Sequence, residues 1–71
     1  MHKDICTRFG KRLRALRLKH EWSQEELAYR VGMAASYLSE VETGKKEPCL
    51  RKIDELAQGL RVSLAQMMRG L

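Results

Sequence analysis

The chain has 71 residues, of which 14 are Lys or Arg and 9 are Asp or Glu, so its formal net charge is +5. This length suits one small domain with a modest core, and no run reaches the roughly 18 apolar residues of a membrane-spanning helix. The basic balance favours an anionic partner, whereas the lack of a glycine-rich phosphate loop, a nucleophile–histidine pair or clustered carboxylates argues against an enzyme.

The first predicted element is an amphipathic helix over residues 4–19. Its apolar positions recur at helical spacing and are Ile5, Phe9, Leu13 and Leu16. Basic amphipathic helices also occur on membrane surfaces, but this apolar stripe is narrow and a domain of this size needs it for its core. We therefore interpret it as part of a globular domain, followed by Trp22 as a core anchor.

The central stretch predicts two short helices, over residues 23–31 and 34–43, joined by a tight turn at Gly32. Ser23 and Glu26 have the spacing of a capping box, and a glycine often follows the last residue of a helix. Two helices joined in this way are typical of the helix-turn-helix unit. The expected inner faces consist of Leu27, Ala28 and Val31 in the first helix, and of Ala34, Tyr37, Leu38 and Val41 in the second.

Two further helices are predicted after a loop rich in glycine and lysine. The fourth covers about residues 49–59, with Gly59 near its end. Its apolar positions are Leu50, Ile53, Leu56, Ala57 and Leu60. A second capping box, formed by Ser63 and Gln66, opens a short fifth helix that runs to about residue 69. Five helices with short links and no strand predict a compact all-α domain.

Lysines and arginines gather in two places. One group lies on or beside the first helix and comprises Lys3, Arg8, Lys11, Arg12, Arg14, Arg17 and Lys19. The other follows the second motif helix and comprises Lys45, Lys46, Arg51 and Lys52. Acidic residues concentrate elsewhere, at Glu25, Glu26, Asp54 and Glu55. This separation favours an electrostatic footprint for nucleic acid over an evenly charged surface.

The cysteines and histidines do not suggest a metal site. Cys6 and Cys49 stand far apart and form no C-x-x-C pair. His2 and His20 are equally isolated, whereas tetrahedral sites need clustered ligands at characteristic spacings. We expect structural or surface roles for all four, with no metal and no cofactor.

Three motifs point to a family. They are LRALR at residues 13–17, WSQEELA at residues 22–28 and YLSEVETG at residues 37–44, with Pro48 after them. Together they resemble the phage repressor and Cro family of XRE-type helix-turn-helix regulators, which includes the controller proteins of restriction–modification systems. The likeness covers about residues 8–70. It implies a five-helix lambda-repressor-like domain over residues 1–71, with the helix-turn-helix at about 23–43, that binds double-stranded DNA.

The resemblance also implies roles for individual residues. Gln24 would contact a DNA phosphate, which the chemistry of a helix N-terminus supports; the alternative is a solvent-exposed glutamine. Glu42 would pair with Arg17 and so fix two helices relative to each other. Lys45 and Lys46 are expected at phosphates, and Arg14 is a further candidate. The expected base-reading residues are Ala35, Ser36, Ser39, Glu40 and Thr43, with Tyr37 between the two faces.

The chain departs from the family pattern at four positions. Ala34 and Cys49 stand where a capping serine or threonine is common, at a cost of about 1 kcal/mol for such a cap. Ala35 replaces a base-reading glutamine. Glu21 replaces a glycine in a turn, with up to about 1 kcal/mol of strain. Base discrimination is therefore expected to depend on the remaining polar residues of the helix and on DNA shape.

We expect a cytoplasmic homodimer that regulates transcription from symmetric half-sites, with no small-molecule ligand and no membrane partner. The C-terminal segment carries a group of apolar residues for which two roles remain open, a dimer contact or closure of the core. They are Leu64, Met67, Met68 and Leu71. An alternative function is a protein-interaction module of the same fold, such as an antitoxin, although the chain ends soon after its fifth helix and offers no long toxin-wrapping tail. RNA binding has no aromatic platform to support it.

Overall fold

Five α-helices follow one another in residues 4–71, the part of the chain that the computed structural model describes, and this part contains no strand. The helices are α1 (Ile5–Lys19), α2 (Gln24–Val31), α3 (Ala35–Glu42), α4 (Leu50–Leu60) and α5 (Leu64–Met67). The predicted all-α architecture is therefore confirmed. His2 and Lys3 lie outside the described residues. No helix of residues 4–71 is long and apolar enough to cross a membrane.

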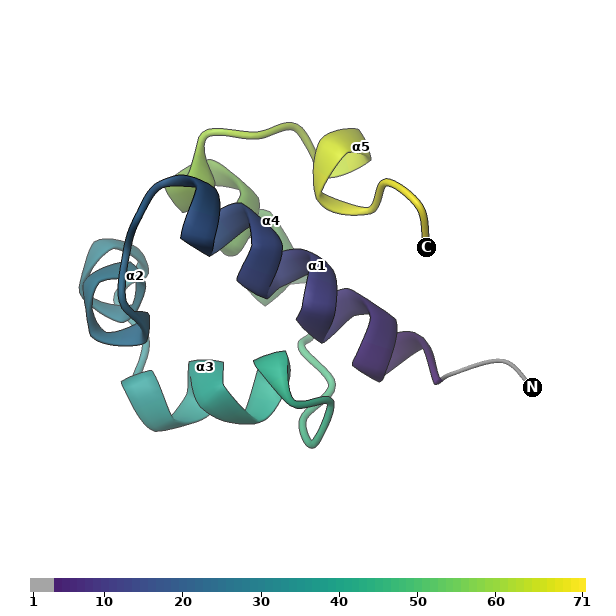
Figure 1. The fold of residues 1–71 in the computed structure, drawn as a ribbon, viewed down its shortest axis with the longest axis horizontal. Helices are drawn as coiled ribbons and strands as arrows, with labels where there is room; N and C mark the ends of the chain where they lie inside the picture. The colour runs from purple at the N-terminus through teal and green to yellow at the C-terminus, as the bar shows by residue number, and fades with distance from the viewer. Residues whose placement is uncertain (1–3) are drawn as a thin grey trace.

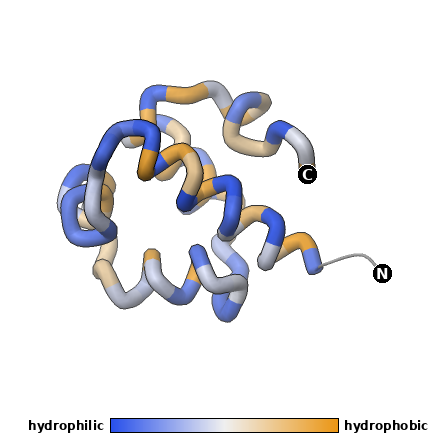
Figure 2. The backbone as a smooth tube through the Cα atoms, in the orientation of Figure 1, coloured by the Kyte–Doolittle hydropathy of each residue, from blue (hydrophilic) through white to orange (hydrophobic). Residues whose placement is uncertain are grey.

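Helix α1 is the longest element, and the other helices pack around it (Figure 1). It contacts α3 on one side and α5 on the other, while α2 contacts both α3 and α4. Hydrophobic residues recur along each of the longer helices (Figure 2). The buried core draws on all five helices and comprises Phe9, Leu13, Leu16, Leu27, Ala28, Leu38, Val41, Leu56, Ala57, Leu60 and Met67.

The predicted helix starts are confirmed, with one difference. The Ser23 hydroxyl accepts a hydrogen bond from the Glu26 N–H at 3.0 Å, but the Glu26 carboxylate binds Arg30 Nε at 2.7 Å instead of closing a capping box. Ser63 and Gln66 form a complete capping box. The Gln66 N–H donates to the Ser63 hydroxyl at 3.0 Å, and the Ser63 N–H donates to Gln66 Oε1 at 2.8 Å. An i,i+4 arginine competes for the Glu26 carboxylate, whereas no such cation follows Gln66.

Helix α4 ends later than predicted. It runs to Leu60, and Arg61 closes it in the left-handed conformation at φ 59°. Gly59 therefore lies inside the helix. A methyl group there would lie 2.3 Å from Cγ1 of Val31, so the glycine serves the close packing of α4 on α2. Helix α5 is also shorter than predicted and ends at Met67, with turns after it.

Three residues expected on inner faces lie at the surface. Leu50 is 75% exposed and Ile5 is 47% exposed, because each stands in the first turn of its helix, beyond the reach of the core. Ala34 is exposed as the N-cap residue of α3. The backbone strain expected in the turn between α1 and α2 is present, because Glu21 adopts the left-handed conformation at φ 61°.

The two uncapped helices allow a stability prediction. Ala34 and Cys49 occupy N-cap positions with extended backbone and no side-chain cap bond. Ala34→Ser is expected to stabilise the domain by about 1 kcal/mol, because the hydroxyl would accept from a free N–H of the first turn. Thermal denaturation followed by circular dichroism measures this gain. Ala15→Ser, on the exposed mid-helix surface of α1, is the matched control and should give no gain.

Candidate nucleic-acid interface

A buried ion pair joins the end of α3 to α1. Arg17 Nε and Nη2 donate to the two carboxylate oxygens of Glu42 at 2.7 and 2.9 Å. Both residues are buried, and the hydrogen bond with Glu42 raises the pKa of Arg17 further above its ordinary value, so the guanidinium stays charged. This bidentate geometry fixes both the distance and the rotation of α3 against α1. The predicted pairing is confirmed.

The pair extends to α2. Arg17 Nη1 donates to the Trp22 carbonyl at 2.7 Å, and Gln24 Nε2 donates to Glu42 Oε1 at 3.1 Å. Gln24 is the first residue of α2 and is half-buried, so it is not the fully exposed glutamine of the alternative interpretation. One network therefore connects α1, the start of α2 and the end of α3. The helix-turn-helix unit is held by polar contacts as well as by Leu27 and Leu38 in the core.

Gly10 allows α1 and α3 to approach more closely than two ordinary helices could. A methyl group at this position would lie 2.4 Å from the carbonyl oxygen of Glu42 and 2.5 Å from that of Val41. Both are backbone atoms, which cannot turn away as a side chain could. The sequence pattern did not predict this role for Gly10. The available signal was a glycine in the middle of a strongly helical stretch, where it otherwise only weakens the helix.

The outer face of α3 carries the polar residues predicted to read bases. Ser36 and Thr43 are exposed, and Ser39 and Glu40 are half-buried. The Thr43 hydroxyl donates to the carbonyls of Ser39 and Glu40, at 2.9 and 3.2 Å. It therefore retains lone pairs and its methyl group for other contacts.

Two residues of α3 lie closer to the core than the outer face. Ala35 was expected on that face, but it is half-buried and packs against the core. Tyr37 also packs there, as expected for a residue between the faces. Burial raises the pKa of the Tyr37 hydroxyl, which therefore remains a protonated donor at neutral pH.

The loop after α3 folds back onto the end of that helix. The backbone N–H groups of Lys45 and Lys46 donate to the Glu40 carbonyl at 2.8 and 3.2 Å, and Gly44 makes the turn at φ 80°. Gly44 also packs against α1, where a methyl group would lie 2.8 Å from the Thr7 hydroxyl. The lysine side chains are exposed directly beyond α3. Arg14 is exposed too, on α1.

Several basic residues of α1 have structural roles rather than forming one open footprint. Arg8 Nη1 donates to the Leu71 carbonyl. Arg12 Nε and Nη2 donate to the Gln66 carbonyl at 3.1 and 2.6 Å. Arg17 holds Glu42. These arginines attach the C-terminal segment and α3 to α1. Part of the predicted basic cluster on the first helix therefore makes contacts within the domain.

The C-terminal apolar residues divide between the two open roles. Met67 is fully buried within the chain, and Leu71 is half-buried against the core. Met67 therefore cannot reach a second molecule, and of the two roles left open for it the structure selects closure of the core over dimer contact. Leu64 and Met68 are 43% and 37% exposed.

The cysteines and His20 lie in separate environments. Cys49 is exposed and Cys6 is half-buried, where burial and then the charge of Asp4 raise the pKa of its thiol. His20 Nε2 donates to the Leu60 carbonyl at 2.8 Å, and its ring stacks on Trp22 with centroids 4.2 Å apart. Trp22 is half-buried and packs on the core, as predicted. Within residues 4–71, no three His, Cys, Asp or Glu side chains gather as metal ligands would.

Comparisons with known proteins agree with this geometry. A family model described as a helix-turn-helix domain matches residues 8–69. The chain is 34% identical over 65 residues to control protein C.MunI of Mycoplasma sp, covering 90% of this chain and 88% of that protein. It is 33% identical over 63 residues to control protein C.BamHI of Bacillus amyloliquefaciens, covering 87% and 78%. The crystal structure of the restriction-modification controller protein C.AhdI from Aeromonas hydrophila superposes with a TM-score of 0.85 at 37% identity, covering 87% and 94%.

Proposed function

The chain belongs to the helix-turn-helix family of transcriptional regulators, and from this premise we propose that it binds double-stranded operator DNA as a homodimer, with α3 in the major groove. The observation that carries the proposal is the placement of α3. Its outer face is polar and open, while its inner face and its end are fixed to α1 by Leu38, Val41 and the Arg17–Glu42 pair. A rigidly held helix with an open polar face can place its side chains against base edges in the major groove.

Contacts to phosphates would position the domain. Gln24 Nε2 carries two N–H donors, and the bond to Glu42 uses one of them, which leaves the other for a phosphate oxygen. The first N–H groups of α2 lie beside it and also favour an anion. Lys45 and Lys46 would approach the backbone from the other end of α3, and Arg14 from α1. These contacts set register and affinity without reading sequence.

Contacts to bases would come from the outer face of α3. Ser36 and Ser39 can hydrogen-bond to several base edges, and Glu40 can accept from cytosine N4. Thr43, whose hydroxyl donates to the helix backbone, would act as an acceptor or through its methyl group. Ala35, half-buried at the start of the helix, is limited to apolar contact with a thymine methyl.

Two single substitutions separate these roles. Ser39→Ala is expected to weaken binding to the preferred duplex by about 0.5–1.5 kcal/mol, the contribution of one neutral hydrogen bond, and to relax preference at one base pair. Lys45→Ala should weaken binding to all duplexes alike and lower the slope of log affinity against log salt by about 1. Fluorescence anisotropy with duplexes selected from a random pool, measured over a range of salt concentrations, gives both quantities. Affinity that does not change with salt would contradict the proposal.

The homodimer follows from the small size of one domain. A single module buries little DNA surface, so two copies on half-sites about one helical turn apart would supply useful affinity. Leu64 and Met68 are the exposed members of the predicted dimer contact. The family comprises regulators rather than enzymes. A regulator of this kind would act in the cytoplasm, where it meets its DNA.

A further inference from the structure

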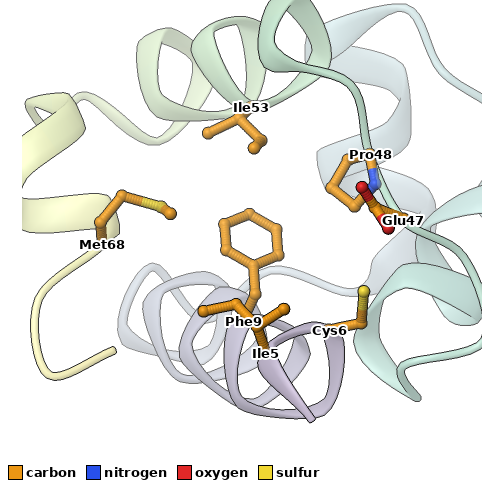
Figure 3. A pocket seen from close by; sticks show the side chains of 7 residues that line it. All are labelled: Ile5, Cys6, Phe9, Glu47, Pro48, Ile53 and Met68. Carbon is orange, nitrogen blue, oxygen red and sulfur yellow. The ribbon is translucent and has the colours of Figure 1, made fainter.

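An apolar hollow of about 140 Å³ lies between the start of α1, the loop before α4, α4 itself and the turn after α5 (Figure 3). Its lining residues are Ile5, Cys6, Phe9, Glu47, Pro48, Ile53 and Met68. Figure 3 shows the Phe9 ring in the middle of the lining residues, with the other side chains around it. Glu47 supplies the lone carboxylate of this lining. Helix α2 lies toward the other end of the molecule in Figure 1.

Exposed apolar side chains lie at and beside the hollow. Large exposed hydrophobic side chains number six in the described chain, and four of them are Ile5, Leu50, Leu64 and Met68. Leu50 stands one helical turn before the lining residue Ile53 on α4. Leu64 stands one turn before Met68, the C-cap residue of α5, whose N–H donates to the Leu64 carbonyl at 3.0 Å. Ile5 and Met68 line the hollow and are also exposed, so the hollow continues into apolar surface, and exposed apolar surface of this kind marks an interaction site.

We propose that a second copy of the chain covers this patch in a twofold arrangement, with Leu50 of each copy seated in the hollow of the other. The inference rests on the proposed homodimer and identifies its interface. A twofold contact uses the same patch on both copies, so a group that protrudes from the patch needs a matching recess within the same patch. Leu50, 75% exposed, is the protruding group, and an apolar recess of about 150 Å³ accepts a group as large as benzene.

Charges beside the protrusion and the recess are also complementary. Arg51 follows Leu50, and Glu47 lines the hollow. No salt bridge within the described residues involves either side chain. Insertion of Leu50 brings Arg51 toward Glu47 of the other copy, and the symmetry produces this contact twice. The two pairs offset part of the repulsion between molecules that each have a net charge of +5.

Sedimentation velocity of the full chain without DNA, over a range of concentrations, tests the role of Leu50. Leu50→Ala is expected to raise the dimer dissociation constant at least about tenfold, because each dimer loses two anchors. Leu18→Ala is the matched control: Leu18 is 50% exposed on α1, outside the hollow, and its removal should leave the constant unchanged. Equal effects of the two substitutions would overturn the proposal. Circular dichroism verifies that both variants remain folded.

A charge exchange tests the orientation of the two copies. Glu47→Arg and Arg51→Glu should each weaken dimerisation, and the double variant should restore it to near the wild-type constant. A double variant as weak as the single ones would overturn the proposed contact. If these variants dimerise as the wild type does and still bind symmetric half-sites, the interface is wrong while the proposed function stands. A wild-type chain that is monomeric throughout and binds DNA as single copies would overturn both.

Discussion

Replacing Arg17 by alanine is expected to lower the melting temperature of the domain by about 12 °C or more. The substitution leaves the Glu42 carboxylate buried without its bidentate partner, and an uncompensated buried charge of this kind costs about 3–5 kcal/mol. For a domain of this size, each kcal/mol corresponds to about 4–8 °C. Thermal denaturation by circular dichroism or calorimetry measures the loss.

The environment of the pair, rather than its charge, should determine the size of this effect. Glu26 and Arg30 form an ion pair with the same 2.7 Å distance, but their side chains are 41% and 44% exposed. Glu26→Ala is therefore the matched control and should cost no more than about 0.5 kcal/mol. The double substitution Arg17→Met, Glu42→Leu should recover most of the lost stability, because it removes both charges. An Arg17→Ala variant that melts within a few degrees of the wild type would disprove the structural role of the pair.

Gly10→Ala is expected to destabilise the domain by about 2 kcal/mol or more, although alanine is the better helix former. The added methyl group would lie 2.4 Å from a backbone carbonyl oxygen of α3, so α1 and α3 must move apart. Overpacking of this kind costs about 1–3 kcal/mol, and a rigid backbone neighbour favours the upper part of that range. The displacement also moves α3, so DNA affinity should fall with stability. Chemical denaturation and DNA titration measure the two losses.

Gly59→Ala provides the comparison. A methyl group at Gly59 would meet a single side-chain methyl, Cγ1 of Val31, at 2.3 Å. Truncation of that side chain by Val31→Ala should therefore relieve much of the clash, whereas no side-chain truncation can relieve the clash at Gly10. If Gly10→Ala proves neutral or stabilising, α1 and α3 do not lie as close together at Gly10 as the 2.4 Å contact requires.

Local chemistry made the helix-turn-helix predictable from sequence. Ser23 and Gly32 act on backbone groups within a few residues of themselves, so their roles hold whatever the remainder of the chain does, and the same is true of Ser63 at the start of α5. The predicted pairing of Arg17 with Glu42 came from family resemblance rather than from spacing. The structure adds the bonds from Arg17 to the Trp22 carbonyl and from Gln24 to Glu42, which depend on the meeting of three helices.

The sequence alone determined the number of helices, most of their starts and the polar face of the second motif helix, because these follow from local hydrogen bonding and hydrophobic periodicity. Only the tertiary structure decided which apolar and small residues face another helix. Periodicity assigned Leu50 to the core and left Met67 open to a partner, but the first is exposed and the second is buried. Gly10 and Gly59 are likewise explained by what lies opposite them. The helix to which a residue belongs fixes the direction of its side chain, whereas the burial and close packing of that side chain depend on neighbours distant in the chain.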